Sequence, residues 1–218
     1  ELAGLPELLP AYLDPEFRGE KLLTGASFAS SASGYADTTA HTLNVLPLDE
    51  QVDNFRLYKA QLVNMVGQEK ATKIVSEALF GLSTGTDDFA INYYINPLTR
   101  NNYSVEDFQN LLIQSLTVFI QNVYSEGCTR LAIIGLPPFG CLPSQITLHN
   151  LLQDTCVEEF NEVARSFNTK IKLLAGEIEL NYSGLQIVYL DIYDTLADIV
   201  NFPIKYGFEE ARKGCCGT

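Results

Sequence analysis

The chain has 218 residues, of which 46% are hydrophobic and 19% are charged, as in a globular protein rather than a disordered one. Its net charge of −13 disfavours binding to nucleic acid or to an anionic membrane surface, because both are negatively charged. No run of about 20 apolar residues is present, so we expect no integral membrane segment. No linker-like stretch divides the sequence, and we expect a single domain over residues 1–218.

Apolar runs of strand length alternate with longer stretches of helical spacing. Short, continuously apolar runs are typical of strands covered on both faces, as in a parallel sheet. In chain order the pattern predicts a helix over residues 49–66, a strand over 79–83, a helix over 105–124, a strand over 131–135, a helix over 155–179 and a strand over 186–191. Ser104 is expected to cap the second helix and Gly127 to stop it. The alternation predicts an α/β fold with a parallel sheet, incomplete at both ends.

The chemistry of such sheets gathers at the carboxyl ends of the strands. We therefore expect functional groups in the segments that follow Ser83, Gly135 and Asp191. Stretches of small, rigid or polar residues lie at 24–34, 82–89, 135–143 and 206–218.

Two kinds of site compete for the segment after Ser83. Residues 81–85 read Gly-Leu-Ser-Thr-Gly, the G-x-S-x-G pattern of α/β-hydrolases, which would make Ser83 a nucleophile and His149 its base. The alternative is that Ser83 simply ends a strand. The adjacent Asp87 and Asp88 suggest a metal site, but no cluster of Asp, Glu or His supports them at ligand spacing, so we expect no metal.

Cysteines and glycosylation sequons favour a secreted protein. The two Asn-x-Ser sequons begin at Asn102 and Asn181. Cys141 and Cys156 flank one loop, and we expect a disulfide to close it. Cys128 precedes an apolar strand and is expected to be a small core residue.

The two ends of the sequence look cut. The chain begins at Glu1 without an initiator Met and stops at Thr218 within a Gly/Cys-rich stretch. The adjacent Cys215 and Cys216 strain against pairing with each other, so at least one is expected to need a partner beyond the cut.

Taken in order, the four stretches resemble the plant GDSL esterase/lipase family. Residues 24–34 resemble its second block, G-x-N-F-A-S with a small-residue tail, and residues 79–94 resemble its third block, whose G-x-N-D core is here Gly-Thr-Asp-Asp. Residues 135–143 resemble its G-L-P-P-x-G-C-x-P loop, and residues 201–218 its N-P-x-x-Y-G-F…C-C-G-T element. The resemblance covers almost the whole chain.

The resemblance implies a three-layer α/β/α sandwich of the SGNH-hydrolase type and acyl transfer by a Ser-His-Asp triad without a cofactor. The implied substrates are acyl esters of lipids or small metabolites. In the family the nucleophile lies in an N-terminal G-D-S block, and its partners lie in a late D-x-x-H block. Neither motif occurs in this sequence, so we expect no catalytic residue within it.

The resemblance also implies an oxyanion hole, but few of the family's oxyanion-hole residues are found at the matching positions of this sequence. Gly25 matches the oxyanion glycine, and Asp87 stands where the family has an asparagine. Ser27 replaces another usual asparagine, while Gly85 and Asp88 belong to the block that lines the pocket. An ionised Asp87 offers no hydrogen-bond donor, whereas burial that keeps it protonated would restore one.

Two classes of function follow from these observations. The first is part of an ester hydrolase that acts in the apoplast or the vacuole. The alternative is a non-catalytic binding or accessory protein with a GDSL-type fold, which Asp87 and the absent blocks favour. In both cases we expect exposed apolar faces, so that the chain aggregates or needs a complementary chain that supplies the missing ends.

Overall fold

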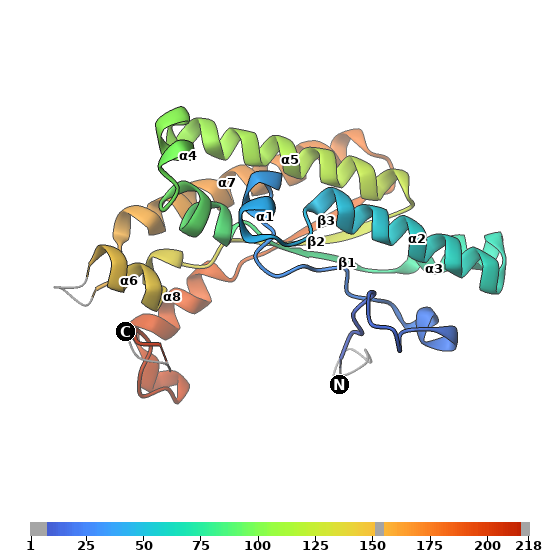
Figure 1. Ribbon diagram of the computed structural model, residues 1–218, viewed down its shortest axis with the longest axis horizontal. Helices are drawn as coiled ribbons and strands as arrows, with labels where there is room; N and C mark the ends of the chain where they lie inside the picture. The colour runs from blue at the N-terminus through green and yellow to red at the C-terminus, as the bar shows by residue number, and fades with distance from the viewer. Residues whose placement is uncertain (1–7, 151–154, 215–218) are drawn as a thin grey trace.

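The computed structural model describes residues 8–150 and 155–214, in which helices and strands alternate (Figure 1). The strands are β1 (Phe80–Ser83), β2 (Arg130–Ile134) and β3 (Gln186–Leu190). The α-helices are α1 (Asp37–Leu43), α2 (Leu48–Val66), α3 (Gln68–Glu77), α4 (Pro97–Asn102), α5 (Val105–Ser125), α6 (Pro143–His149), α7 (Glu158–Asn181) and α8 (Tyr193–Asn201). A π-helix, η2 (Asp88–Tyr93), and the 3-10 helices η1 (Gly19–Thr24), η3 (Phe139–Cys141) and η4 (Pro203–Tyr206) are shorter.

The three strands form one parallel sheet in the order β1-β2-β3. Phe80 lies opposite Leu131, and Arg130 lies opposite Gln186, so β2 is the central strand. The α/β class and the parallel sheet expected from the sequence are confirmed. Helix α5 joins β1 to β2, and α7 joins β2 to β3. Both crossovers advance in the same direction, so right-handed connections place both helices over the same face, as Figure 1 shows.

The main core lies between this face of the sheet and the two crossover helices. Leu112 and Leu116 of α5 are completely buried, as are Phe167 and Ile171 of α7 and Ile133 of β2. Burying one such side chain contributes roughly 1.5–3 kcal/mol. The helical spacing of these apolar residues is therefore the reason that α5 and α7 form and dock where they do.

A second apolar cluster ties the N-terminal segment to α2 and α3. Phe17 packs with Phe55, Tyr58 and Leu62 of α2, and the Tyr58 hydroxyl donates to the carbonyl oxygen of Leu22 at 2.5 Å. This cluster fixes the position of the chain that leads into the stretch 24–34.

The helix boundaries differ from the prediction where local bonds intervene. Helices α2 and α5 match to within one residue, and Ser104 caps α5 as expected by accepting from the Asp107 amide at 3.1 Å. Helix α7 starts only at Glu158, because Val157 before it has an extended backbone with a ψ of 94°; its amide donates to the carbonyl oxygen of Gly140 at 2.8 Å. Helix α3 was not expected: Gly67, at φ +84°, ends α2 and lets a second helix begin at once.

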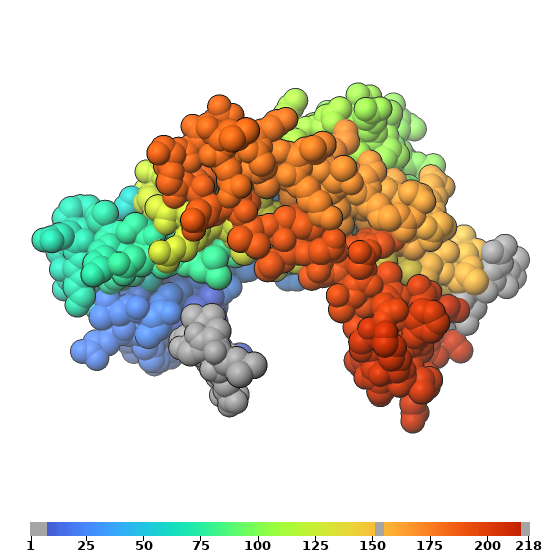
Figure 2. Space-filling model, turned by 180° about the vertical axis from the view of Figure 1, so that it is seen from behind, coloured from blue at the N-terminus to red at the C-terminus, as the bar shows by residue number. Residues whose placement is uncertain are grey.

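The opposite face of the sheet carries exposed apolar side chains. In β3, Ile187 joins the core and Tyr189 lies under Lys172 of α7, so the alternating Val188 and Leu190 point away from the helices. Val188 is 55% exposed and Leu190 is 43% exposed. The surface is hollowed between the N-terminal segment in blue and the C-terminal segment in red (Figure 2).

Candidate functional site

The turn after β1 lies at the carboxyl edge of the sheet, where functional groups were expected. Gly85 adopts a φ of +109°, and a Cβ atom there would lie 2.7 Å from Cε2 of Tyr35 and 2.9 Å from Cδ2 of Leu136. A side chain at this position would be strained in its backbone and would collide with two neighbours. Gly85 thus allows the turn to pack between two segments that are far apart in the sequence.

Asp88, expected to line the pocket, is instead fully buried. Its Oδ2 accepts from the Tyr35 amide at 2.5 Å, and its Oδ1 accepts from the Ala36 amide at 3.1 Å and from the Thr39 hydroxyl at 2.5 Å. Burial raises the pKa of Asp88 to about 7, although these three hydrogen bonds act to lower it. The side chain therefore holds the turn before α1 rather than forming a pocket wall.

Asn92 extends this buried polar network into α4. Its Nδ2 donates to the hydroxyls of Thr38 at 3.1 Å and Thr39 at 2.9 Å, and its Oδ1 accepts from the Thr99 hydroxyl at 2.7 Å. The π-helix η2 places Asn92 and Asp88 side by side, so α1 is held by two polar side chains from one element. Sequence reasoning missed Thr39 and Asn92; the available signal was the presence of polar residues within an otherwise apolar stretch.

Asp87 differs from its neighbour in having access to solvent. It is partly buried, and that burial raises the pKa of its carboxyl group. Among the described residues its carboxylate has no hydrogen-bond or ion-pair partner. A protonated carboxyl group at this position can donate a hydrogen bond to a developing oxyanion, whereas a carboxylate cannot.

Gly25 lies at the end of stretch 24–34 that is close to the N-terminal segment. It has a φ of +95°, and a Cβ atom there would approach Cδ1 of Leu9 at 3.4 Å. Nearby, Ser27 forms an isolated parallel bridge with Ala11. No described contact joins Gly25 to the turn that carries Asp87.

Gly34, at the other end of the same stretch, does meet that turn. A Cβ atom there would lie 2.8 Å from Cγ of Asp88 and 2.9 Å from Cβ of Thr39. Between the two glycines, Ala32 adopts a φ of +67°, which is unusual for a residue with a side chain. The structure thus brings the stretches 24–34 and 82–89 together through Gly34 and not through Gly25.

A hollow of about 490 Å³ opens beside this stretch and is lined by Ser30, His41, Asn44, Val45, Leu46, Pro47 and Glu50. The Ser30 hydroxyl accepts from the Leu46 amide at 3.0 Å and so fixes one wall.

The stretch after β2 is tied to the sheet and to α7. The Gly135 amide donates to the carbonyl oxygen of Leu190 at 3.0 Å. The Asn168 side chain accepts from the Leu136 amide at 2.7 Å and donates to the Leu136 carbonyl at 3.0 Å. Neither the sequence pattern nor the resemblance pointed to Asn168.

A disulfide closes the following loop between Cys141 and Cys156, the pair expected from the sequence. Asn161 of α7 supports the loop, since its Oδ1 accepts from the Gly140 amide at 3.0 Å and its Nδ2 donates to Sγ of Cys141 at 3.4 Å. Cys128 is free and buried, and burial raises the pKa of its thiol to about 12. Cys215 and Cys216 lie outside the described residues.

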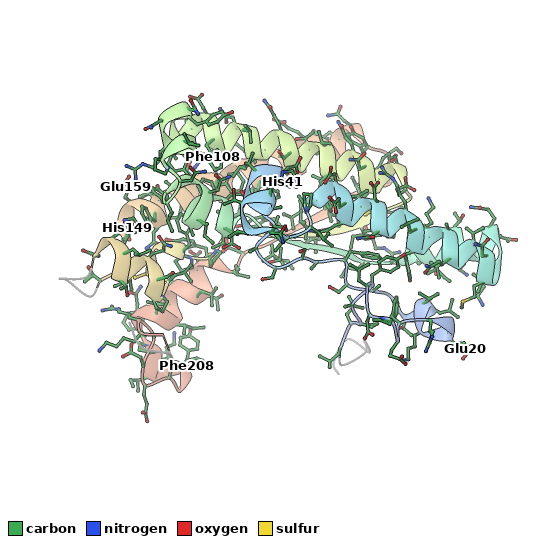
Figure 3. All side chains as sticks on the ribbon, viewed as in Figure 1. Glu20, His41, Phe108, His149, Glu159 and Phe208 are labelled. Atoms are coloured by element: carbon green, nitrogen blue, oxygen red, sulfur yellow. A yellow bond between two sulfur atoms is a disulfide. The ribbon has the colours of Figure 1, made fainter. Side chains whose placement is uncertain are left out.

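Ser83 and His149 are held in different surroundings. Ser83 is the last residue of β1, whereas His149 ends α6 and packs its ring against Phe160 at 4.9 Å. The other histidine, His41, lies on α1 (Figure 3). Within residues 8–150 and 155–214 no hydrogen bond joins Ser83 to either histidine, and no group of three or more His, Cys, Asp or Glu side chains could hold a metal ion.

Both sequons lie on the surface. Asn102 ends α4 and is exposed, although the hydroxyl of Ser104 in the same sequon is engaged as the α5 cap. Asn181 ends α7 and is exposed, and its Nδ2 donates to the carbonyl oxygen of Glu177 at 2.7 Å.

Comparison with known sequences gives a match over nearly the entire chain. The family model described as GDSL-like Lipase/Acylhydrolase matches residues 2–218. The chain belongs to this GDSL family. Similar proteins of Arabidopsis thaliana include GDSL esterase/lipase APG, 44% identical over 218 residues, and GDSL esterase/lipase At5g03810, 43% identical over 219 residues.

The alignment with these GDSL relatives covers 100% of this chain but only 62% of the length of each of the two. The family's G-D-S and D-x-x-H motifs do not occur in the 218 residues. In the described part of this GDSL chain, no helix is long and apolar enough to cross a membrane.

Proposed function

We propose that this chain forms part of an ester hydrolase that acts on acyl esters of lipids or small metabolites. The observation that carries the proposal is the GDSL-family match over residues 2–218, together with the similarity to proteins named GDSL esterase/lipase. The reaction is acyl transfer to water through a Ser-His-Asp triad whose members lie outside this chain.

In this proposal the chain supplies part of the oxyanion hole. Asp87 stabilises the tetrahedral oxyanion while its carboxyl group is protonated, and the partial burial that raises its pKa supports this role. Gly25 supplies a backbone donor in the same proposal, and Gly85 shapes the turn beside Asp87. Asp88 acts from the interior, because its side chain is fully buried.

The alternative is a binding or accessory protein that has kept the GDSL fold without catalysis. The observation that favours it is Asp87, since an ionised carboxylate would repel an oxyanion. Loss of one oxyanion donor typically lowers the rate about 10²–10³-fold.

A chimera separates these two functions. The 218 residues replace the aligned region of GDSL esterase/lipase APG, so that the relative's own flanking residues complete the protein. We expect hydrolysis of short-chain esters by this chimera. Turnover only after Asp87→Asn would favour the accessory function, and no turnover from either version, with both folded, would contradict the proposed hydrolase.

The 218-residue chain alone provides a second test with a fluorophosphonate probe for serine hydrolases, read by intact mass. We expect neither labelling nor ester turnover, because the proposed nucleophile is absent. Labelling within the chain that disappears in Ser83→Ala would show that Ser83 is the nucleophile and would overturn the placement of the triad.

We also propose that the protein is secreted to the apoplast or delivered to the vacuole. The Cys141–Cys156 disulfide and the exposed Asn102 and Asn181 support passage through an oxidising, glycosylating compartment. Expression in plant cells followed by treatment with a glycosidase that removes N-glycans tests this, and an unchanged mass would count against it.

A complementary chain is the last part of the proposal. The exposed Val188 and Leu190 on the open sheet face support it, because apolar side chains that are exposed together can mark an interaction site. Co-expression with the flanking segments of GDSL esterase/lipase APG as separate chains is expected to yield a soluble complex. Recovery of this chain as a free, soluble monomer beside the expressed segments would contradict the idea.

A further inference from the structure

Asp88 joins two parts of the chain that are about fifty positions apart. Its carboxyl group receives the amide hydrogens of Tyr35 and Ala36 and the hydroxyl hydrogen of Thr39, while Gly34 leaves no room for a side chain between them. These contacts fix the turn before α1 onto η2.

The number of hydrogen bonds that this group can accept depends on its protonation. As a carboxylate, Asp88 accepts all three hydrogen bonds. With a proton on Oδ2, the oxygen can no longer serve as a full acceptor for the Tyr35 amide; with a proton on Oδ1, the same is true for the Ala36 amide. Whichever oxygen takes the proton, one backbone amide is left with a weaker acceptor in a buried place.

We propose that Asp88 is a pH-responsive tether, which holds the turn 33–36 tightly as a carboxylate and more loosely as a carboxylic acid. The turn 33–36 begins at the end of the stretch 24–34 and meets the segment 85–88 at the sheet edge. The protonation of Asp88 therefore sets how rigidly these two segments are joined. The inference rests on contacts within the chain and is independent of the proposed hydrolysis.

The electrostatic surroundings agree with a titration in a physiological range. Burial raises the pKa of Asp88 to about 7, and the carboxylate of Asp87, which precedes it, raises the pKa further. On α1, the pKa of Asp37 is raised by burial first and then by the charge of Asp49 of α2, while His41 acts to lower it. Facing Asp88 across the turn, Tyr35 has a pKa raised mainly by burial and next by the charge of Asp88. No cation thus neutralises Asp88 among the residues that the structure describes.

Hydrogen-exchange mass spectrometry with residue resolution tests the tether on the 218-residue chain at low concentration. Protection factors of the Tyr35 and Ala36 amides are measured from pH 5.5 to pH 8.5 and corrected for intrinsic exchange. We expect a loss of protection of about tenfold at one or both amides on acidification, the change that corresponds to one lost hydrogen bond. The midpoint should lie near neutrality.

Three variants test whether Asp88 is the group that causes the pH dependence of amide protection. In Asp88→Asn the pH dependence should vanish. Thr39→Val retains the carboxyl group but removes one donor to the carboxylate, so the midpoint should move to higher pH. In the matched control Asp37→Asn, which removes the acid at the start of α1, the dependence should persist.

The direction in which amide protection changes with pH also distinguishes local opening of the turn from global unfolding. The buried charge of Asp88 makes the whole fold less stable at high pH, so exchange through global unfolding would become faster at high pH, opposite to the tether. Protection that is independent of pH, or that rises on acidification at both amides, overturns the proposal. Persistence of the titration in Asp88→Asn or its loss in Asp37→Asn does the same.

Discussion

Gly34 and Gly176 differ in what surrounds their Cα atoms. At Gly34 a methyl group would press on Asp88 and Thr39, and φ is +72°, whereas at Gly176 in α7 nothing lies within 4 Å. We expect Gly34→Ala to destabilise the protein by about 2–4 kcal/mol through collision and backbone strain. Gly176→Ala should stabilise it by up to about 1 kcal/mol, because alanine favours a helix. Urea unfolding monitored by circular dichroism measures both; equal effects would contradict the close approach at Gly34.

The buried carboxyl of Asp88 makes stability depend on pH. The pKa in the folded state, about 7, is above the ordinary value of 3.8, so the folded state binds the proton more tightly than the unfolded state does. The stability linked to this group is therefore greatest below about pH 4 and is lost as pH rises through about 7. We expect the free energy of unfolding to fall by roughly 2–3 kcal/mol between pH 5 and pH 8.

Asp88→Asn should remove this slope, and denaturant titrations at several pH values provide the measurement. Carboxylates whose pKa is lowered, such as Glu126 beside Lys59, remain ionised above pH 5 and do not mask the effect. An unchanged slope in Asp88→Asn would show that another group is responsible.

At the residue scale the sequence located the turn around Asp87 but not the role of its neighbour. The carboxyl end of a strand could be predicted from the apolar run that precedes it. The burial of Asp88 could not, because its partners Tyr35, Ala36 and Thr39 lie about fifty residues away. Only the tertiary fold brings their donors to it.

Among the elements, the loop between η3 and α7 depends on the disulfide. Cys141 and Cys156 are 15 positions apart, and closing a loop of that length contributes about 3 kcal/mol through the unfolded state. We expect the double variant Cys141→Ser/Cys156→Ser to lose about that much stability in urea unfolding. Reduction should bring the wild-type protein to the level of the variant and leave the variant unchanged, and a reductant effect on the variant would point to other thiols.

Helices and strands with strong apolar periodicity were predicted to within a few residues. The long helices α5 and α2 are examples, since each buries a continuous apolar stripe. Helix α1 and the π-helix η2 were not predicted, because both are short. Helix α1 is held by side-chain hydrogen bonds from Asp88 and Asn92. The π-helix buries Phe89, Ala90 and Tyr93 in the main core, but six residues are too few to show a helical period. Contacts with residues far away in the sequence stabilise these elements, so they could not be predicted from the local sequence pattern.

For the whole molecule, the open sheet face predicts self-association. Val188→Lys places a charge on this face and should reduce association measured by sedimentation velocity, without lowering stability. Leu173→Lys introduces the same charge at a residue of α7 that is 64% exposed, and it should leave association unchanged. An equal effect of both variants would indicate that net charge, rather than the sheet face, controls association.

The pairing of the sheet also sets the order in which the chain can be assembled during synthesis. Phe80 pairs with Leu131, and Arg130 pairs with Gln186, so each strand waits for a partner more than fifty positions later. At about 5–20 residues per second, β3 leaves the ribosome roughly 3–11 s after β2. During that interval the β1–β2 pair and α5 exist while the other edge of β2 is bare. A nascent chain of this protein therefore leaves this edge of β2 unpaired for seconds, long enough for a chaperone to bind it before β3 arrives.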